Sequence, residues 1–543
     1  MSAADDSVWT PFRRRVFRAI WIAQFVGNIG TWAQTVGAQW LMGDLGGGAF
    51  EVSLVQTAMT LPVFLLVLPA GSLGDIFDRR RLLIVSQTIM LAGAGALAIL
   101  TFAHATTSAL LLLLTATIGA GNALSAPSFA AVQPELVPRD EVPRAALLNG
   151  ASVNLARAVG PAIAGLLIGS VGPAGTFTLN AVSFAGVIAA LARWRRPRDH
   201  RPLGAEHVRD AIAAGIRYTR NAPHFATVLA RSLLFIVPAS ALWTLLAVLA
   251  RGPLELGATG YGVLLGSVGI GAVTGTIVVI PRLRRRLTAN ELVTLGSVGY
   301  GAGLIALAVT DFMPLVIAEC AVTGMAWIAV TSSVNAHAQL LLPNWTRARA
   351  LAFMNLTFQG GQAIGSVLLG SLAGALSVEA AFGIAGALEV AGAIAGAVWL
   401  ALPPLGHVES ARYWPEPNLV IDVEPDSGPV LVTVEWRIAP SRSDEFAEAM
   451  RPLRRARRRT GATRWGLFRD TADPALFLET FTVDTWSEHM RQHIERGTID
   501  DEELEARARR FLEGEGTPRV RHLLWAYSAS SAAPAPAGRG DRP

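Results

Sequence analysis

Long apolar stretches separated by short polar turns dominate the chain up to Leu402. Each stretch is about 20 residues long, the length that a helix needs to cross about 30 Å of hydrocarbon. We count twelve, with approximate ranges 16–41, 52–73, 82–103, 108–131, 146–170, 174–194, 226–250, 260–281, 290–309, 312–335, 350–375 and 379–402. The pattern predicts an all-α polytopic membrane protein with twelve transmembrane helices.

Composition supports this prediction. The 543 residues are 52% hydrophobic and 16% charged, which differs from the usual balance of a soluble globular protein. The segment "FRRRVFRAIW" (12–21) runs into a first apolar stretch of full spanning length with no small-residue cleavage site. We therefore expect this stretch to remain as an anchor. The single Cys320 excludes an intramolecular disulfide.

Every basic residue is an arginine, and the arginines are unevenly distributed between the turns. Turns on one side contain most of them, including 79–81 and 284–286, whereas the turns on the other side contain only Arg251. Short basic loops stay in the cytoplasm. We therefore expect a cell (inner) membrane protein with both termini cytoplasmic. Because topology explains the high basic charge, no nucleic-acid partner is expected.

The two halves of the apolar region repeat each other at an offset of 205 positions. This offset superposes 79–81 on 284–286, Pro138 on Pro343, Arg144 on Arg349 and Gly160 on Gly365 without a gap. The matches fall at equivalent places in two sets of six helices. The sequence therefore predicts a parallel duplication, in which both halves enter the membrane from the same side.

A specific resemblance follows from the turn "GSLGDIFDRRR" (71–81) and from "LVPRDEVPRAALLNGASVNLARAVGPAIAG" (136–165). The first resembles the signature between helices 2 and 3 of major facilitator transporters. Asp78 replaces the usual second glycine, as in the secretion-effector and enterobactin-exporter-like branch. The resemblance covers about residues 12–402. It implies two six-helix halves with a substrate site between them at mid-depth.

The resemblance also implies a gating motif, made of Gly71, Asp75, Asp78, Arg79, Arg80 and Arg81. Gly71 permits close helix contact. Asp75 is expected against the positive end of a neighbouring helix, such as 350–375, or paired with an arginine. The alternative is a turn whose charges only set topology. A second stretch, Gly160, Pro161 and Gly165, resembles the helix-5 motif of antiporters and is expected to bend its helix.

Polar side chains at membrane depth predict a cavity. Gln24, Asn28, Thr31, Thr35 and Gln39 share one face of the first helix, where bonding to another helix is as good an explanation as substrate contact. The repeat aligns Asn154 with Gln359 and Arg157 with Gln362. The predicted substrate and cavity residues are Asn28, Thr31, Thr35, Asn154, Arg157, Gln359 and Gln362.

Arg157 falls near the predicted bilayer centre, where a charge is costly unless it is paired or used. It could attract an anionic or catecholate-like substrate, or balance a migrating acid. The alternative is a structural arginine bonded to carbonyls around Gly160 and Pro161. Arg231 lies nearer a helix end, so we expect it to snorkel to the interface.

Glu319 and Glu389 are the acids well inside the predicted spans, and both are candidates for proton coupling. Their weakness is depth, because each lies about 10–15 Å from the outer face and could point at a wet vestibule. The N-terminal half has no such acid.

The composition changes after Pro404, and strand and helix patterns follow in the order βαββαβ, which predicts a ferredoxin-like domain. The predicted organisation is a cytoplasmic N-terminus (1–15), an N-terminal six-helix bundle (16–194), an inter-bundle linker (195–225), a C-terminal bundle (226–402), a linker (403–429), the ferredoxin-like domain (430–527) and a disordered tail (528–543). The domain resembles the dimeric α+β barrel of antibiotic-biosynthesis monooxygenases, which implies possible dimerisation.

Two features of this domain have ordinary explanations. His489 and His493 could bind a metal at i, i+4 spacing, but without a third ligand we interpret them as solvated helix histidines and expect no metal site. The arginine run within 451–459 either contacts anionic headgroups or is a solvated helix face.

The leading hypothesis is a secondary active exporter of a small organic molecule, such as a siderophore, drug or secondary metabolite. We expect alternating access, proton antiport, no cofactor and no enzyme activity. The alternatives are an importer, or a membrane-anchored enzyme or sensor whose activity resides in the C-terminal domain.

Overall fold

The computed structural model describes residues 7–526, except 77, 139, 195–207, 344, 406–410, 412–413, 415–416, 418–420 and 514–516; only the backbone is described for 67–69, 71–76, 208–214 and 348. The chain forms two compact units. The first contains the long helices, and the second contains the C-terminal domain together with residues 210–226 and 339–350. The predicted tail 528–543 lies outside the described residues.

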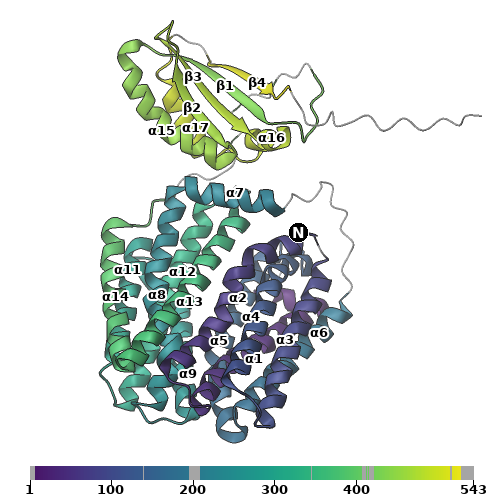
Figure 1. The fold of residues 1–543 in the computed structure, drawn as a ribbon, viewed down its shortest axis with the longest axis vertical. Coiled ribbons are helices and arrows are strands. Elements are labelled where there is room, and N and C mark those ends of the chain that lie inside the picture. Colours follow the sequence, from purple (N-terminus) through teal and green to yellow (C-terminus); the bar gives the residue numbers. More distant parts are fainter. Residues whose placement is uncertain are drawn as a thin grey trace, which may run out of the picture. The chain divides into compact units, whose positions relative to one another are not determined.

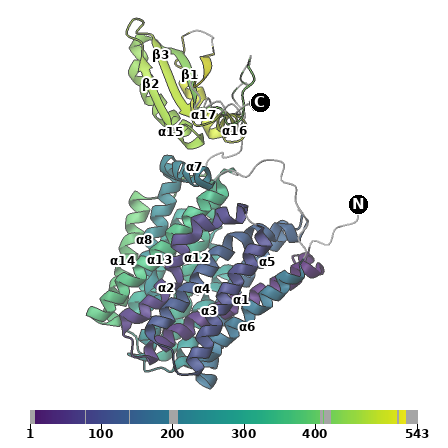
Figure 2. The same cartoon turned by 45° about the vertical axis from the view of Figure 1, so that its right-hand side comes forward.

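Long helices form the N-terminal half of the first unit (Figures 1 and 2). They are α1 (Arg15–Asp44), α2 (Ala49–Ile76), α3 (Arg79–Phe102), α4 (Ser108–Val132), α5 (Val142–Val171) and α6 (Pro173–Arg193). Helix α1 packs along α5 and α6, whereas α4 packs along α2 and α3. Local capping explains several starts: the side chains of Asp78 and Thr107 accept hydrogen bonds from the first turns of α3 and α4.

The C-terminal half repeats the plan with α8 (Pro223–Arg251), α9 (Ala258–Thr274), α11 (Ala289–Leu307), α12 (Met313–Leu341), α13 (Arg347–Ala375) and α14 (Val378–Trp399). Helix α9 continues through a π-helical segment (Gly275–Val279) into α10 (Ile280–Leu283). All these long helices lie at the predicted positions. The largest difference is at α12, which continues to Leu341 rather than ending near 335.

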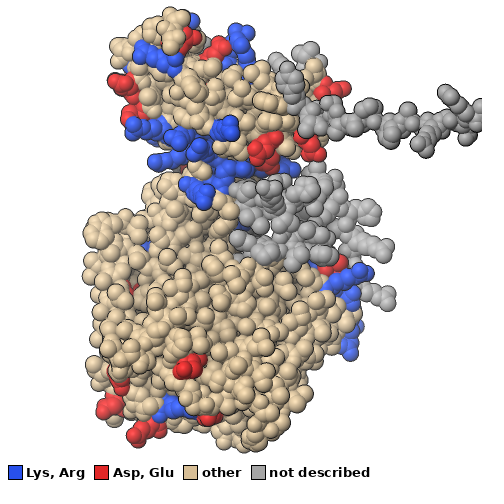
Figure 3. Space-filling model, in the orientation of Figure 1, with Lys and Arg blue, Asp and Glu red and all other residues tan. Residues whose placement is uncertain are grey.

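Nine helices among the described residues are long and apolar enough to cross a membrane. The three long helices α1, α11 and α13 do not meet the same criteria, and two of them contain the polar positions that were predicted to line a cavity. Figure 3 shows the corresponding surface, where the long helices present a broad and largely uncharged band. The chain is therefore a polytopic membrane protein, because a broad uncharged surface is compatible with hydrocarbon rather than with water.

The two halves contact each other closely where α5 crosses α9. A Cβ atom added to Gly165 would lie 2.9 Å from the Cα of Gly262, and one added to Gly262 would lie 2.8 Å from the Cα of Gly165. Small residues allow backbones to approach in this way. Helix α5 also packs on α1, because a Cβ at Gly160 would lie 2.6 Å from the Cβ of Trp32. The α5 helix is continuous through Pro161.

The second unit contains a four-stranded antiparallel sheet with strand order β2-β3-β1-β4. Its elements are β1 (Val430–Arg437), α15 (Ser443–Thr460), β2 (Arg464–Arg469), β3 (Leu476–Val483), α16 (Trp486–Ile494), α17 (Ile499–Arg509) and β4 (Arg519–Leu524). This sequence of elements agrees with the predicted βαββαβ order, except that the last helix is two helices. Alternate residues of β1 are buried against α15, with Trp436, Phe446 and Phe481 in the core.

The predicted linker 195–225 contains a helix that the sequence analysis missed, α7 (Val208–Asn221). Within the second unit, Arg217 forms a 4.0 Å ion pair with Asp484, and the ring of Tyr218 packs edge-on against Trp345 at 5.7 Å. The guanidinium of Arg496 lies 5.0 Å from the Trp345 ring. Segments before α8 and after α12 therefore belong to the same packed unit as the C-terminal domain.

Candidate functional site

A cavity of about 520 Å³ lies between the two halves of the first unit. Its walls come from α5, α8, α12 and α13. Asn335 and Leu351 line it near the arginine-rich ends of α12 and α13, and Trp327 and Gln359 line it deeper in the same helices. The cavity thus runs from the arginine-rich side towards the middle of the helices.

The structure brings Asn154, Arg157 and Gln359 together in this cavity, as the sequence predicted for three of its seven polar positions. These residues come from opposite halves, because α5 and α13 occupy equivalent places in the repeat. Gln362 is buried and is not among the residues that line the cavity. The polar wall is therefore narrower than the predicted belt.

Arg157 is half-buried, and its guanidinium lies 5.5 Å from the centroid of the Trp32 ring. Its Nε atom is buried and has no hydrogen-bond partner among the described residues. The alternative prediction, an arginine held by carbonyls around Gly160 and Pro161, does not match these contacts. A cation that lines a cavity and lacks a carboxylate partner there can attract an anion.

The remaining predicted cavity residues of α1 have different environments. Asn28 and Thr31 line a smaller cavity of about 270 Å³ within the N-terminal half. The hydroxyl of Thr35 donates a 3.0 Å hydrogen bond to the carbonyl of Thr31, its own preceding turn. Gln39 bonds to the other half. The face of α1 was predicted correctly as polar, but its members do not share one site.

The sequence analysis missed the contribution of α12 to the cavity. Thr331, Ser332 and Asn335 line it, together with an aromatic group formed by Phe235, Trp327 and Phe358. The ring centroids of Trp327 lie 5.5 Å from Phe235 and 5.8 Å from Phe358. The polar run 331–335 inside an apolar helix was the available signal. The cavity therefore combines one cation with amide, hydroxyl and aromatic surface.

At the end of the unit opposite the arginine-rich turns, an ion pair joins the two halves. Oδ1 of Asp44, at the end of α1, lies 2.5 Å from Nη2 of Arg251, at the end of α8. The same guanidinium lies 4.2 Å from the ring of Trp40. These contacts hold the two halves together at this end.

A second link lies one turn deeper. Gln39 donates a 2.8 Å hydrogen bond to the carbonyl of Trp243 and accepts a 2.5 Å hydrogen bond from the hydroxyl of Tyr261. Both partners belong to the C-terminal half. Gln39 thus bonds to other helices, which is one of the two explanations left open by the sequence.

The predicted gating motif is only partly described. Only the backbone is described for Gly71 and Asp75. Asp78 caps α3 by accepting a 2.9 Å hydrogen bond from the backbone of Arg81. Arg79 forms a 2.9 Å ion pair with Glu135. Arg80 donates to the carbonyls of Leu191 and Ala192 at 2.7 and 2.8 Å. These contacts stay within the N-terminal half.

The two predicted coupling acids have unequal environments. Glu389 of α14 is 1% exposed, and Arg231 and Ser297 face it from α8 and α11. Glu319 is only half-buried and accepts a 2.9 Å hydrogen bond from the hydroxyl of Thr310, in the turn before α12. Neither acid lines the main cavity. Glu389 is therefore the deeper and less solvated of the two.

The prediction that Arg231 snorkels to the interface is wrong. Its side chain is buried, and its guanidinium donates a 2.6 Å hydrogen bond to the hydroxyl of Thr294. A Cβ on Gly396 would lie 2.1 Å from its Nη1. The absence of a side chain at 396 leaves room for the guanidinium between helices. No residue spacing along the chain indicated this packing.

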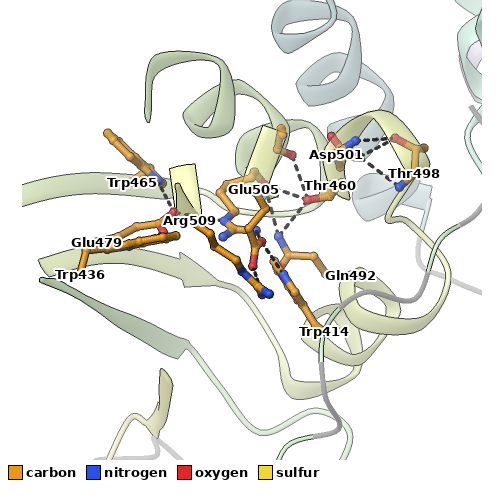
Figure 4. A network of polar contacts seen from close by, with 12 residues as sticks. Trp414, Trp436, Thr460, Trp465, Glu479, Gln492, Thr498, Asp501, Glu505 and Arg509 are labelled. Atoms are coloured by element: carbon orange, nitrogen blue, oxygen red, sulfur yellow. Dashed lines mark hydrogen bonds and ion pairs between the residues drawn. The ribbon is translucent and has the colours of Figure 1, made fainter. Parts of the chain in front are cut away.

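The C-terminal domain contains a buried network of charges (Figure 4). Arg457 of α15 lies 3.1 Å from a carboxylate oxygen of Glu479 and 3.0 Å from one of Glu505. Tryptophan indoles complete the shell: Trp465 and Trp436 donate to Glu479, and Trp414 donates to Glu505. Burial opposes ionisation of Glu505, but Arg457 and the Trp414 hydrogen bond hold its pKa below the usual value.

Both interpretations of the arginine run within 451–459 are wrong for Arg457. Its side chain is 3% exposed, so it is neither solvated nor available to headgroups. The helical spacing that makes α15 amphipathic places Arg457 on the same side as Phe446 and Leu453. Its two acidic partners come from β3 and α17, which the sequence could not pair with it.

The interpretation of His489 and His493 as solvated histidines is also wrong. Both are buried, at 0% and 8% exposure, and they approach His522 of β4. Burial lowers the pKa of His489 to about 3 and that of His493 to about 4, so both rings are neutral at pH 7. Nothing in the local sequence indicated that His522 would join them.

The chain is similar to a known protein family and to several known transporters. The sequence profile of transmembrane secretion effectors matches residues 6–530. The multidrug efflux pump Tap of Mycobacterium tuberculosis is 26% identical over 406 residues, which cover 72% of this chain and 94% of that protein. The staphyloferrin A transporter of Staphylococcus aureus is 22% identical, covering 67% of this chain and 91% of that protein. The enterobactin exporter of Salmonella typhi is 23% identical, covering 68% and 88%.

Solved structures support the same fold. A transporter of the POT family in complex with 5-aminolevulinic acid aligns with a TM-score of 0.58 and 14% identity, covering 70% of this chain and 95% of that chain. The nucleoside transporter NupG aligns with a TM-score of 0.55 and 14% identity, covering 70% and 98%.

Proposed function

Because the chain belongs to the transmembrane secretion effector family of major facilitator transporters, we propose that it exports a small organic molecule by alternating access. The observation that carries this proposal is the cavity between the two halves, which is lined by Arg157 and by polar and aromatic side chains from both halves. Similar proteins are an efflux pump and siderophore transporters. These similarities favour export over the alternative of import.

The cavity suits an anionic or catecholate-like substrate with aromatic character. Arg157 supplies the positive charge, and the rings of Trp327 and Phe358 supply apolar surface. Amides of Asn154 and Gln359 can orient the substrate through hydrogen bonds. Siderophores and acidic drugs or secondary metabolites combine these features.

We further propose twelve transmembrane helices, with α1, α11 and α13 spanning alongside the nine more apolar ones. A helix inside a bundle tolerates polar residues that face a cavity or a neighbouring helix. The arginine-rich turns then face the cytoplasm of a cell (inner) membrane, and both termini are cytoplasmic. The main cavity lies towards that side, and the Asp44–Arg251 pair closes the opposite side. This arrangement corresponds to an inward-facing state.

The Asp44–Arg251 pair is expected to make a small contribution to the closed outer side. Both side chains are partly exposed, at 44% and 34%, and such pairs contribute about 0–1 kcal/mol. Asp44→Asn should therefore change the initial transport rate by less than about fivefold. The double variant Asp44→Arg with Arg251→Asp exchanges the two charges and should have the initial transport rate of wild type. Asp311→Asn, an exposed acid at the same end, is the control; a loss that the exchange does not restore contradicts a role for the pair.

Proton antiport is the proposed energy source, with Glu389 as the coupling group. A buried carboxyl beside Arg231 can gain and lose a proton as the surrounding helices move. In proteoliposomes, Glu389→Gln should reduce transport driven by a pH gradient by at least about a hundredfold, the lower end of the range typical of proton-transfer groups. Exchange of substrate across the membrane without a gradient should persist.

Glu319→Gln is the matched control, because Glu319 is half-buried and bonded to Thr310. We expect its gradient-driven transport to stay within about twofold of wild type, because the glutamine oxygen can still accept the hydrogen bond from Thr310. If both variants keep full gradient-driven transport, the coupling proposal fails. The export proposal survives that result, because another ion could drive the same cycle.

The C-terminal domain is proposed to be ferredoxin-like and to resemble antibiotic-biosynthesis monooxygenase domains, as its strand order suggests. Dimerisation through this domain is a proposal of the same kind. The family assignment favours transport over enzyme activity for the whole chain. If a chain that lacks residues 420–543 still transports its substrate, the membrane-spanning part carries the function and the enzyme alternative is excluded.

A further inference from the structure

Three histidines converge in the C-terminal domain, outside the transport cavity. His489 and His493 lie one turn apart on α16, and His522 lies on β4, the edge strand next to β1. One ring nitrogen of each lies within 4.8 Å of those of the other two. The ring centroids of His489 are 4.6 Å from His493 and 4.9 Å from His522. The three side chains thus surround one point.

Their nitrogen atoms lack the partners that buried histidines normally have. Nδ1 of His493 and Nε2 of His522 are buried without a hydrogen-bond partner among the described residues. The ring nitrogens of His489 make no hydrogen bond of ordinary geometry there, although the Gln492 side chain lies close to this ring. His489 has no exposed surface. A neutral imidazole has one donor and one acceptor, and buried polar atoms are rarely left unpaired without a reason. Packing alone therefore does not explain this cluster.

Neighbouring residues hold the rings in place without occupying the shared point. The ring of Trp486 lies 5.4 Å from His489, and Trp414 packs edge-on against His493 at 4.6 Å. The indole of Trp414 is itself fixed by a 2.7 Å hydrogen bond to Glu505. The buried charge network described above therefore supports the position of the histidine cluster.

We propose that His489, His493 and His522 form a binding site for a divalent transition-metal ion of the zinc class. Three imidazole nitrogens suit Zn²⁺, Co²⁺, Ni²⁺ or Cu²⁺, whereas Mg²⁺ and Ca²⁺ require oxygen ligands. Zinc–nitrogen bonds are about 2.0–2.1 Å long, so small rotations of the rings bring the nitrogens into range. A solvent molecule or an exogenous ligand completes the tetrahedron.

The site is separate from substrate binding and can be tested separately. It links α16 to β4, elements that are far apart in the sequence, so a bound ion cross-links the domain. The proposal does not depend on export: failure of transport leaves it unchanged, and failure of metal binding leaves the export proposal unchanged.

Metal binding to the full-length chain tests the proposal. The protein is purified in detergent with a histidine-free tag, stripped with a chelator, and titrated with Zn²⁺ and with Co²⁺. We expect one equivalent of Zn²⁺ to bind, and Co²⁺ to give the visible absorption bands of a tetrahedral nitrogen site. His522→Ala and His489→Ala should each weaken Zn²⁺ binding at least a hundredfold.

His224→Ala is the matched control, because His224 is exposed at the start of α8, and it should bind Zn²⁺ as wild type does. Circular dichroism and size-exclusion profiles of each variant establish that it is folded. The conservative variant His522→Asn provides a second test if His522→Ala fails to fold. Wild-type protein that binds no Zn²⁺ above the level of a folded His522 variant would overturn the proposal.

Discussion

Arg157→Gln is expected to reduce the transport efficiency for an anionic substrate by about 10- to 100-fold. Hydrogen bonds to charged groups contribute about 1.5–3 kcal/mol, and each 1.4 kcal/mol corresponds to a factor of about ten. Arg157 lines the cavity and its Nε has no partner among the described residues, so under the proposed function we expect the substitution to remove a substrate contact. Transport of an acidic drug and of a catecholate siderophore in proteoliposomes measures the effect.

Arg157→Lys should recover part of the rate, because it retains the charge but not the planar guanidinium. The control is Arg18→Gln, at an exposed position on α1, for which no loss is expected. Uncharged substrates should be affected less than anionic ones. Wild-type efficiency for every anionic substrate in the Arg157→Gln variant would rule out Arg157 as the substrate-binding cation.

Arg457→Met should destabilise the C-terminal domain by about 3–5 kcal/mol, the usual cost of removing one member of a buried ion pair. Among the described residues, the substitution leaves Glu479, which is 0% exposed, with only indole donors, while Glu505 retains Arg509. Hydrogen–deuterium exchange of β1 and β3 in the full-length protein, followed against urea concentration, measures the change.

Arg455→Met is the matched control, because Arg455 is exposed on the same helix; surface substitutions usually change stability by less than about 0.5 kcal/mol. Adding Glu479→Gln to Arg457→Met should recover part of the loss, since it removes the unpaired charge. A change below about 1 kcal/mol for Arg457→Met would mean that solvent reaches the two carboxylates.

The long helices could be predicted from the sequence because their signal is local. A helix that crosses a bilayer must be apolar over about 20 residues, so length and hydropathy suffice to find it. The end of α12 was missed because Asn335, His337 and Gln339 interrupt the apolar pattern, although they continue the helix. Helix α7 was missed because it is amphipathic and follows the charged stretch 195–207 of the sequence, where hydropathy alone gives no signal.

The candidate site could be predicted only in part. The repeat identified Asn154, Arg157 and Gln359, because equivalent positions in two related halves face the same centre. It failed for Gln362, which is buried and does not line the cavity. Spacing along one helix fixes which side chains share a face, but it does not fix how that helix is rotated against its neighbours. Thr31 and Gln39 share a face of α1 and still reach different partners.

Contacts between segments that are distant in the chain could not be predicted from the sequence. His522 follows His493 by a helix, a loop and part of a strand, and Arg457 meets acids from β3 and α17. Each of these residues has a commonplace local explanation, such as a solvated histidine or a basic helix face. Only the pairing of strands and the packing of helices on the sheet places them together.

Chemical cross-linking at the outer side tests the central claim, that the two halves move against each other around the cavity. In a Cys320→Ala background, Asp44→Cys and Arg251→Cys are joined by a short bis-maleimide, which holds α1 against α8 where their native side chains meet. Transport in proteoliposomes should fall to background after cross-linking, while the two single-cysteine variants treated with the same reagent should remain active. Full transport by the cross-linked protein would contradict alternating access between these halves.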